Sequence, residues 1–358
     1  MLYSDPWLCN FLCSVHLINP NYYVLIITPF GPETGSGNWR TAERYARLLQ
    51  GQGVPAEIAV GIPTPVKITK ATAALVLHAR RSHAAASLIR SAGIPYGVVL
   101  TGTDLYADLA GTSTPEFLQQ ALETIRDATV LIGLQNDACV RVQQVFSEKA
   151  PQDMPPCRVL LQSASLNLER MRRGIRPDRA RNLRVLVVGH VRKEKDPLTA
   201  FQAFLSLPHT ASLHHLGGSL DDALMRELYV LAHQHPGRIR LLGQCDADTV
   251  RAEMAWADLM VHPSVMEGGA LVIAEAFGQG LPVLASRIPG HLGILGEDYP
   301  AYFAQGQVED LSRQLDAFLS DNTVGALWFE ALVQRAPQLC SEEREAQQLL
   351  GIIQELLA

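Results

Sequence analysis

Two glutamates in the stretch VHPSVMEGGALVIAEAFGQGLPVLA, residues 261–285, have the spacing and surroundings of ligand-binding or catalytic groups. Glu267 and Glu275 are separated by seven residues, and Gly268 and Gly269 follow the first of them. The pattern predicts a strand end, a glycine turn and a helix whose free N-terminal N–H groups attract an anion. Glu275 would lie about two turns further along, on nearly the same helix face. An anion site beside two carboxylates favours a nucleotide-sugar site.

Three further groups of polar residues follow apolar runs in the first half of the chain. Because ligands of doubly wound sheets bind at the carboxyl ends of the strands, we expect these groups to line one cleft. Each also has a plainer interpretation: glycines for a flexible turn, arginines flanking a helix, a histidine that only packs, an aspartate that caps a turn. The residues are Gly35, Gly37 and Asn38 after the run 22–28, His78, Arg80 and Arg81 in the run 74–83, and Thr101, Thr103 and Asp104 in the run 96–109.

The elements that would position these residues alternate between strand and helix patterns. Continuous apolar runs such as YYVLIIT, residues 22–28, are typical of buried parallel strands, and helical patterns follow them. A second alternation starts with LRVLVVG, residues 183–189, after the polar, arginine-rich stretch 164–182. This order predicts an α/β protein with two Rossmann-like, doubly wound domains facing a central cleft.

The domain boundaries follow from the same pattern. Residues 1–21 are apolar but lack a basic start and a small-residue cleavage site, so we expect a non-core extension rather than a signal peptide. The expected order is then an N-terminal Rossmann-like domain over 22–165, a linker over 166–182, a C-terminal Rossmann-like domain over 183–330, and C-terminal helices over 331–358 that are able to cross back to the first domain.

Composition narrows the classes of partner and compartment. The net charge of −6 over 358 residues disfavours a general nucleic-acid partner. No run of 18 or more apolar residues occurs, so we expect no membrane insertion. The cysteines lack CxxC spacing and no histidine cluster accompanies them, which predicts free, buried thiols in a reducing compartment, the cytoplasm. They lie at positions 9, 13, 139, 157, 245 and 340.

One stretch resembles a metal motif. CDADT, residues 245–249, places Asp246 and Asp248 two residues apart. It follows a predicted strand and precedes a predicted helix, so helix capping explains the aspartates better than metal binding. We therefore expect no essential metal.

The second half resembles the family-4 glycosyltransferases of the GT-B fold. The resemblance spans residues 183–304 and includes a loop ending in lysine, VVGHVRKEKDP, and the context EGGALVIAEAFGQGLPVLAS. A closer resemblance, over roughly residues 23–320, is to the selenosugar synthases of selenoneine biosynthesis. It is carried by TPFGPETGSGNWRTAERYARLL, LHARRS, LTGTDLY, LIGLQ, LLQSA, VVGHVRKEKDP, HPSVMEGGA and LGEDYPAYF.

The resemblance implies a reaction that forms a carbon–selenium bond. A sugar from UDP-N-acetylglucosamine or UDP-glucose would pass to selenophosphate, giving a 1-seleno sugar, UDP and phosphate. No cofactor is implied beyond these co-substrates, and the product would be handed to other enzymes of the selenoneine pathway. Selenophosphate is anionic at neutral pH, so a strong general base is not required.

Roles for individual residues come from the same resemblance. Lys195 and Arg192 would stabilise the diphosphate as its charge grows, and Glu267 would act near the donor sugar. His78 would contact either the donor sugar or the acceptor. Glu275 would hold the ribose hydroxyls. The remaining donor-binding residues would be Gly35, Gly37, Asn38, His190, Gly268 and Gly269. The acceptor-binding residues would be Arg80, Arg81, Thr101, Thr103 and Asp104.

The chain departs from these families at a few positions. His190 stands where family-4 members place an arginine, and Leu271 and His291 stand where the selenosugar synthases more often have asparagine. These departures bear on the choice of substrate more than on the class of reaction.

Three alternatives stay open: a glycosyltransferase with an ordinary alcohol acceptor, a sugar-nucleotide isomerase on the same fold, and a non-catalytic nucleotide-sugar binding protein.

Overall fold

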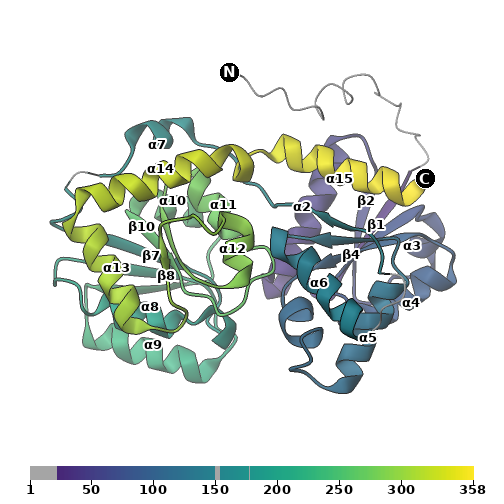
Figure 1. Cartoon of the computed structure of the whole chain (residues 1–358), viewed down its shortest axis with the longest axis horizontal. Helices are drawn as coiled ribbons and strands as arrows, with labels where there is room; N and C mark the ends of the chain where they lie inside the picture. Colours follow the sequence, from purple (N-terminus) through teal and green to yellow (C-terminus); the bar gives the residue numbers. More distant parts are fainter. Residues whose placement is uncertain (1–21, 150–153, 177) are drawn as a thin grey trace.

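A computed structural model describes residues 22–149, 154–176 and 178–358, so the extension expected over residues 1–21 lies outside the described part. The chain forms two six-stranded sheets. All the strand pairs within them are parallel. Figure 1 shows the two sheets side by side, each with helices on its faces. The predicted α/β class with two doubly wound halves is confirmed.

The N-terminal sheet has the strand order β2-β1-β3-β4-β5-β6. Four of its strands are buried along their whole length, which explains their continuous apolar runs. The strands are β1 (Val24–Thr28), β2 (Ala56–Val60), β3 (Ala73–Leu77), β4 (Tyr96–Leu100), β5 (Val130–Gly133) and β6 (Cys157–Val159). The α-helices of this half are α2 (Gly37–Gly51), α3 (Pro65–Lys70), α4 (His83–Ser91), α5 (Pro115–Arg126) and α6 (Asn136–Lys149).

The C-terminal sheet has the order β12-β11-β10-β7-β8-β9. Its strands are β7 (Arg184–Val188), β8 (Ser212–Leu216), β9 (Ile239–Gly243), β10 (Leu259–His262), β11 (Val283–Ser286) and β12 (Tyr302–Phe303). The α-helices that follow β6 are α7 (Leu168–Arg173), α8 (Pro197–Phe204), α9 (Asp222–Gln234), α10 (Ala247–Trp256), α11 (Leu271–Gly278), α12 (Pro289–Leu295), α13 (Val308–Ser320), α14 (Asn322–Leu339) and α15 (Glu342–Leu357).

Several local elements escaped the sequence patterns, among them β2, α3, α7 and α12. The edge strand β2 is mostly half-exposed, so it lacks the apolar run that marks the central strands. Helix α7 lies within the stretch expected to be a linker, and its side-chain cap is Asn167, which accepts from the Arg170 N–H. Residue 330, where we expected a domain boundary, lies inside the continuous helix α14.

The expectation of free thiols is wrong for one pair of cysteines. Cys139 on α6 and Cys157 on β6 form a disulfide across a sequence separation of 18 residues. Helix α6 connects β5 to β6, and β6 pairs with β5 in parallel. This arrangement places β6 beside α6, with the two cysteine Cα atoms 5.6 Å apart. Cys245 and Cys340 are free, whereas Cys9 and Cys13 lie outside the described residues.

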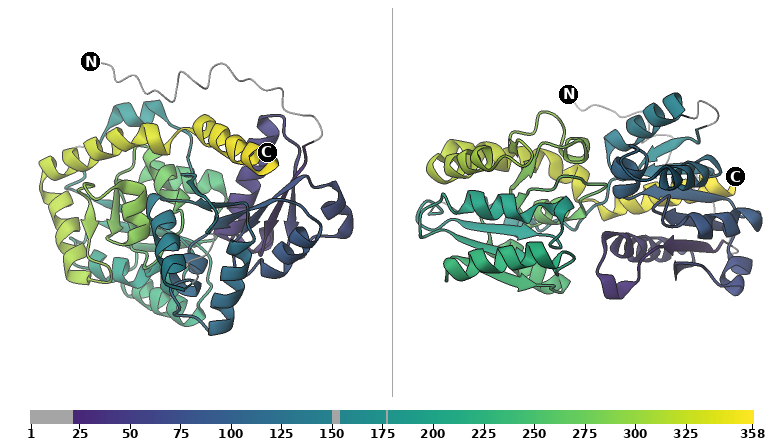
Figure 2. Two further views of the ribbon diagram at one scale, coloured as in Figure 1. Left: turned by 45° about the vertical axis from the view of Figure 1, so that its right-hand side comes forward. Right: turned by 90° about the horizontal axis from the view of Figure 1, so that it is seen from below.

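The C-terminal helices connect the two halves. Figures 1 and 2 show α14 over the C-terminal half and α15 continuing onto the N-terminal half, where it packs against α2. Arg44 on α2 binds Glu345 on α15 through Nε and Nη2, with the shortest N–O distance at 2.6 Å. Glu345 is fully buried and also accepts from the Ser163 N–H at 2.7 Å. Among the described helices, none is both long and apolar enough to cross a membrane.

Breaking the Arg44–Glu345 pair tests this connection. We expect Glu345→Ala to lower the free energy of unfolding by about 3 kcal/mol, because the change removes the buried partner of the Arg44 guanidinium and leaves it only the part-exposed Glu342. Urea denaturation measures the loss. Glu343→Ala on the exposed face of the same helix is the matched control and should change stability by less than about 0.5 kcal/mol. Equal losses in the two variants would contradict a stabilising role for the pair.

Candidate active site

A cavity of about 590 Å³ lies between the two halves, at the carboxyl ends of both sheets. Its walls come from loops far apart in the sequence, which is where doubly wound sheets bind ligands. Most of the predicted site residues line it: Gly35, Gly37, Asn38, His78, Arg81, Thr101, Thr103, His190, Arg192, Lys195, Glu267, Gly268, Gly269 and Glu275. Arg80 and Asp104 are not among its lining residues.

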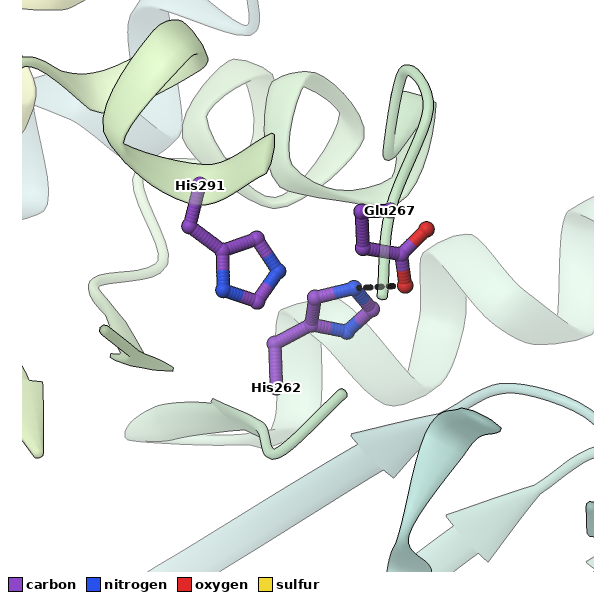
Figure 3. A group of neighbouring side chains, drawn as sticks. All are labelled: His262, Glu267 and His291. Atoms are coloured by element: carbon purple, nitrogen blue, oxygen red, sulfur yellow. Dashed lines mark hydrogen bonds and ion pairs between the residues drawn. The ribbon is translucent and has the colours of Figure 1, made fainter. Parts of the chain in front are cut away.

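Glu267 is the centre of a buried polar cluster on the C-terminal side. Its Oε1 contacts the Lys195 ammonium, accepts from the Ser264 hydroxyl at 2.6 Å and lies 3.0 Å from His262 Nε2. Figure 3 shows the facing His262 and Glu267 side chains. Burial alone would raise the pKa of Glu267, but the Lys195 charge and the hydrogen bond with His262 hold it well below its ordinary value. Glu267 is therefore a fixed anion and not a proton donor.

The glycine turn after Glu267 brings the backbones of the two halves together. A Cβ on Gly268 would lie 2.3 Å from the Thr101 carbonyl carbon, and one on Gly102 would lie 2.9 Å from the Gly268 nitrogen. A Cβ on Gly269 would meet the Leu134 side chain at 2.8 Å. These glycines are thus required by a close approach between domains, a reason that the local sequence does not reveal. Helix α11 begins beyond them at Leu271.

Glu275 on α11 is a half-buried carboxylate that faces the cavity. Among the described residues its side-chain oxygens have no hydrogen-bond partner. Burial raises its pKa, and the positive charges of Arg40 and Arg44 work against that rise. A carboxylate with free acceptor oxygens at the wall of a cavity is suited to bind a pair of hydroxyl groups.

The N-terminal wall contains His78 in a strained backbone position. Its φ is +69°, and its Nε2 lies 2.9 Å from the Thr103 hydroxyl oxygen. Burial lowers the pKa of His78, although the nearby Asp104 charge opposes this. The imidazole is therefore neutral at pH 7. Its position at the end of β3 places it beside Thr101 and Thr103, at the end of β4.

Asp104 lies behind this wall and not on it. The side chain is fully buried, and its oxygens accept from the backbone N–H groups of Ala79, Thr101, Gly102 and Leu105 at 2.9–3.1 Å. These bonds hold the ends of β3 and β4 together. The plainer interpretation from the sequence, a capping aspartate, therefore describes its contacts better than a ligand-binding role.

The two adjacent arginines have different surroundings. Arg80 Nε donates to Asp108 Oδ2 at 2.7 Å, and its guanidinium stacks 4.1 Å from the Phe117 ring centroid. Arg81 lies over Phe30 and lines the main cavity as well as a smaller neighbouring one. Partial burial and the charges of Arg80 and Arg192 lower the pKa of Arg81. The cleft there has an excess of positive charge that an anion would relieve.

Two loops from opposite halves meet at His190. Its Nε2–H donates to the Gly35 carbonyl at 3.1 Å, so the residue joins the glycine loop after β1 to the loop after β7.

Ser264 and His262 contact Glu267 but were not singled out from the sequence, although both lie in the stretch 261–285. Asp246 accepts from the Thr249 N–H at 2.8 Å as the cap of α10.

Comparisons with known proteins agree with this architecture. Residues 173–331 match the family model described as "Glycosyl transferases group 1". Among solved structures, HepE of Anabaena in complex with UDP and glucose superposes with a TM-score of 0.74 at 16% identity, covering 93% of this chain and 99% of that one. Sucrose-phosphate synthase of Thermosynechococcus elongatus gives 0.75 at 15%, covering 94% and 99%. The fold is GT-B.

Curated relatives match only over part of their length. The phosphatidylinositol N-acetylglucosaminyltransferase gpi3 subunit of Schizosaccharomyces pombe is 31% identical over 103 residues, which are 29% of this chain and 22% of that protein. D-inositol 3-phosphate glycosyltransferase of Xylanimonas cellulosilytica is 34% identical over 129 residues, 34% of this chain and 30% of that protein. The matched segments thus span less than a third of each relative.

The Lys195–Glu267 pair makes a pH-dependent contribution to stability. Because the folded pKa of Glu267 lies below the ordinary 4.5, this contribution is complete above about pH 4.5 and is lost as pH falls through the lowered pKa. In Lys195→Met, burial should instead raise the pKa of Glu267. We expect a loss of about 3 kcal/mol at pH 7 that shrinks as Glu267 takes up a proton at lower pH.

Urea denaturation of both proteins between about pH 4 and pH 8 measures this difference. Lys193→Met removes an exposed lysine from the same loop and serves as the control. A deficit in Lys195→Met that stays constant with pH would contradict the electrostatic assignment.

Proposed function

We propose that this protein is a glycosyltransferase that uses a UDP-sugar donor. The observation that carries the proposal is the arrangement of two unlike carboxylates in one cleft. Glu267 is neutralised by Lys195, whereas Glu275 keeps free acceptor oxygens. The matching family model covers the half that contains both residues. A cation beside the diphosphate and a carboxylate for the ribose diol are the groups that such a donor needs.

The proposed donor site divides the chemistry between these groups. Lys195 and Arg192 compensate the negative charge that grows on UDP as its bond to the anomeric carbon breaks. Glu267 orients Lys195 and lies near the developing positive charge of the sugar. The loop of Gly35, Gly37 and Asn38, held by His190, closes over the diphosphate from the N-terminal side. His78 and Thr103 face the sugar.

We propose selenophosphate as the acceptor, on the basis of the resemblance to the selenosugar synthases. The selenium of selenophosphate would attack the anomeric carbon while the bond to UDP breaks. Water would then cleave the Se–P bond and release phosphate, leaving the 1-seleno sugar. Arg81 suits the acceptor phosphate because it faces the cavity, whereas Arg80 is already bound to Asp108. Guanidinium groups pair with phosphate oxygens through two hydrogen bonds.

The surroundings of the carboxylates favour an acceptor that is already anionic. Glu267 carries a lowered pKa and is occupied by Lys195, so it is a weak base. Burial also lowers the pKa of His78, which lies beside Thr103, so its imidazole is a weak base too. An alcohol acceptor would need its proton removed, but a selenophosphate anion would not. The excess positive charge near Arg81 and Arg192 supports the same choice.

Further features of the proposal come from the resemblance alone. They are a choice between UDP-N-acetylglucosamine and UDP-glucose, and handover of the product to other enzymes of selenoneine biosynthesis. The cytoplasmic location is instead expected from the cysteine pattern. Each stays a prediction.

Replacing Glu275 tests the donor site. We expect Glu275→Gln to raise the KM for the UDP-sugar about 10- to 100-fold, because a hydrogen bond to a charged acceptor contributes about 1.5–3 kcal/mol. Steady-state kinetics and UDP titration calorimetry measure the effect. Glu227→Gln on exposed α9 should leave both values unchanged. Wild-type UDP affinity in Glu275→Gln would contradict the ribose assignment.

Product analysis tests the acceptor. Mass spectrometry after incubation with UDP-N-acetylglucosamine or UDP-glucose and selenophosphate should detect a selenium-containing sugar and UDP. We expect Arg81→Met to raise the KM for selenophosphate about tenfold or more, while Arg90→Met at an exposed position of α4 does not. UDP release only with alcohol acceptors would favour the ordinary glycosyltransferase, and sugar interconversion without acceptor would favour the isomerase.

A further inference from the structure

Three buried side chains beside the proposed catalytic lysine form a compact set of metal-ligand atoms. His262 ends β10, Glu267 lies in the loop that follows, and His291 lies in the first turn of α12. One ligand atom from each lies within 4.8 Å of the other two. Figure 3 shows the His291 ring with one nitrogen turned toward the His262–Glu267 pair. Among the described residues, no other cluster of this kind occurs.

His291 has the hydrogen bonding of a metal-ligating histidine. Its Nδ1–H donates to the Ser286 carbonyl at 2.7 Å, which leaves the Nε2 lone pair as an acceptor. The side chain is fully buried, and Nε2 has no hydrogen-bond partner among the described residues. Histidines that bind metals commonly donate their other ring N–H to a carbonyl or carboxylate, which orients the ring. Burial lowers the pKa of His291 to about 3, so the imidazole is neutral.

We propose that His262, Glu267 and His291 bind a divalent transition-metal cation of the Zn²⁺ or Co²⁺ type, in competition with Lys195. Two imidazoles and a carboxylate suit these ions and disfavour Mg²⁺ and Ca²⁺, which prefer oxygen ligands. Metal–ligand distances of about 2.0–2.1 Å require ligand atoms about 3.3 Å apart. The His262–Glu267 distance of 3.0 Å already meets this condition. His291 must move by about 1–1.5 Å relative to the observed limit of 4.8 Å.

Lys195 controls access to the site. Its ammonium contacts Glu267 Oε1, the oxygen that also lies 3.0 Å from His262 Nε2, and both Lys195 and Glu267 line the cavity. An incoming cation must therefore displace Lys195, whose side chain is 19% exposed and has room to turn toward the cavity. The remaining coordination position of the bound ion would face the cleft. Metal binding and the Lys195–Glu267 ion pair exclude each other.

The consequence for turnover rests on the proposed function. A metal ion that withdraws Glu267 from Lys195 would disturb the diphosphate end of the donor site, so Zn²⁺ should inhibit and Mg²⁺ should not. The proposed site would therefore inhibit or regulate the protein. It does not change the expectation that catalysis needs no metal.

Direct binding measurements test the site without any assay of glycosyl transfer. Co²⁺ titration of the full chain, followed by visible absorption, and Zn²⁺ calorimetry should show one site. We expect His291→Asn to weaken binding at least tenfold, since even a lost orienting partner costs 10- to 100-fold. Lys195→Met should tighten binding, because it removes the competing ammonium and keeps the aliphatic stem. No effect is expected from His214→Asn, which alters a histidine–glutamate pair without a third ligand.

Weaker metal binding in His291→Asn together with tighter binding in Lys195→Met would support the proposal. Unchanged metal affinity in His291→Asn, or unchanged affinity in Lys195→Met, would overturn the proposal. Circular dichroism and thermal melts of each variant identify any that fails to fold, and His291→Gln then replaces His291→Asn. Zn²⁺ binding by a protein that transfers no sugar even in metal-free assays would contradict the proposed function and leave the metal site supported.

Discussion

The close approach of two backbones at Gly102 and Gly268 is the constraint on which the cleft depends. Any side chain at Gly268 would collide with Thr101, and its neighbour Gly269 leaves room for Leu134 in the same way. The contact brings the end of β4 against the loop after β10. It therefore places His78 and Thr103 opposite Glu267 and Lys195, so that a single cavity receives groups from both sheets.

Charge balance across this contact explains the chemistry that we propose. On the C-terminal side, the buried Glu267 is stabilised by Lys195, Ser264 and His262, so its charge is permanent and its basicity low. On the other side, Arg81 lies in the field of Arg80 and Arg192 with no acidic side chain within ion-pair distance among the described residues. In the proposed reaction, the cleft would stabilise an anion at each end of the donor–acceptor pair. An anionic nucleophile fits it better than a neutral alcohol.

The C-terminal helix α15 connects the two halves at a distance from the proposed active site. Glu345 on α15 binds Arg44 on α2 and the backbone of Ser163, which precedes the chain's crossing into the second half. Ala164 N–H donates to the Leu339 carbonyl, so the outgoing and returning chain segments run beside each other. Helix α2 starts at the glycine loop, and the Arg44 contact therefore also fixes the loop that closes over the proposed diphosphate position.

The sequence by itself determined the α/β class, most strands and the loops that carry polar residues. These features depend on local periodicity and on the rule that parallel strands place their ligands at one edge. It did not distinguish Arg81 from Arg80, because only the fold places Asp108 and Phe117 around one of them. It left open whether Asp104 caps the backbone or binds a ligand, and it did not show that Cys139 meets Cys157 or that His291 faces Glu267. Each of those outcomes is a contact between elements distant in sequence, and only tertiary packing decides which side chains meet.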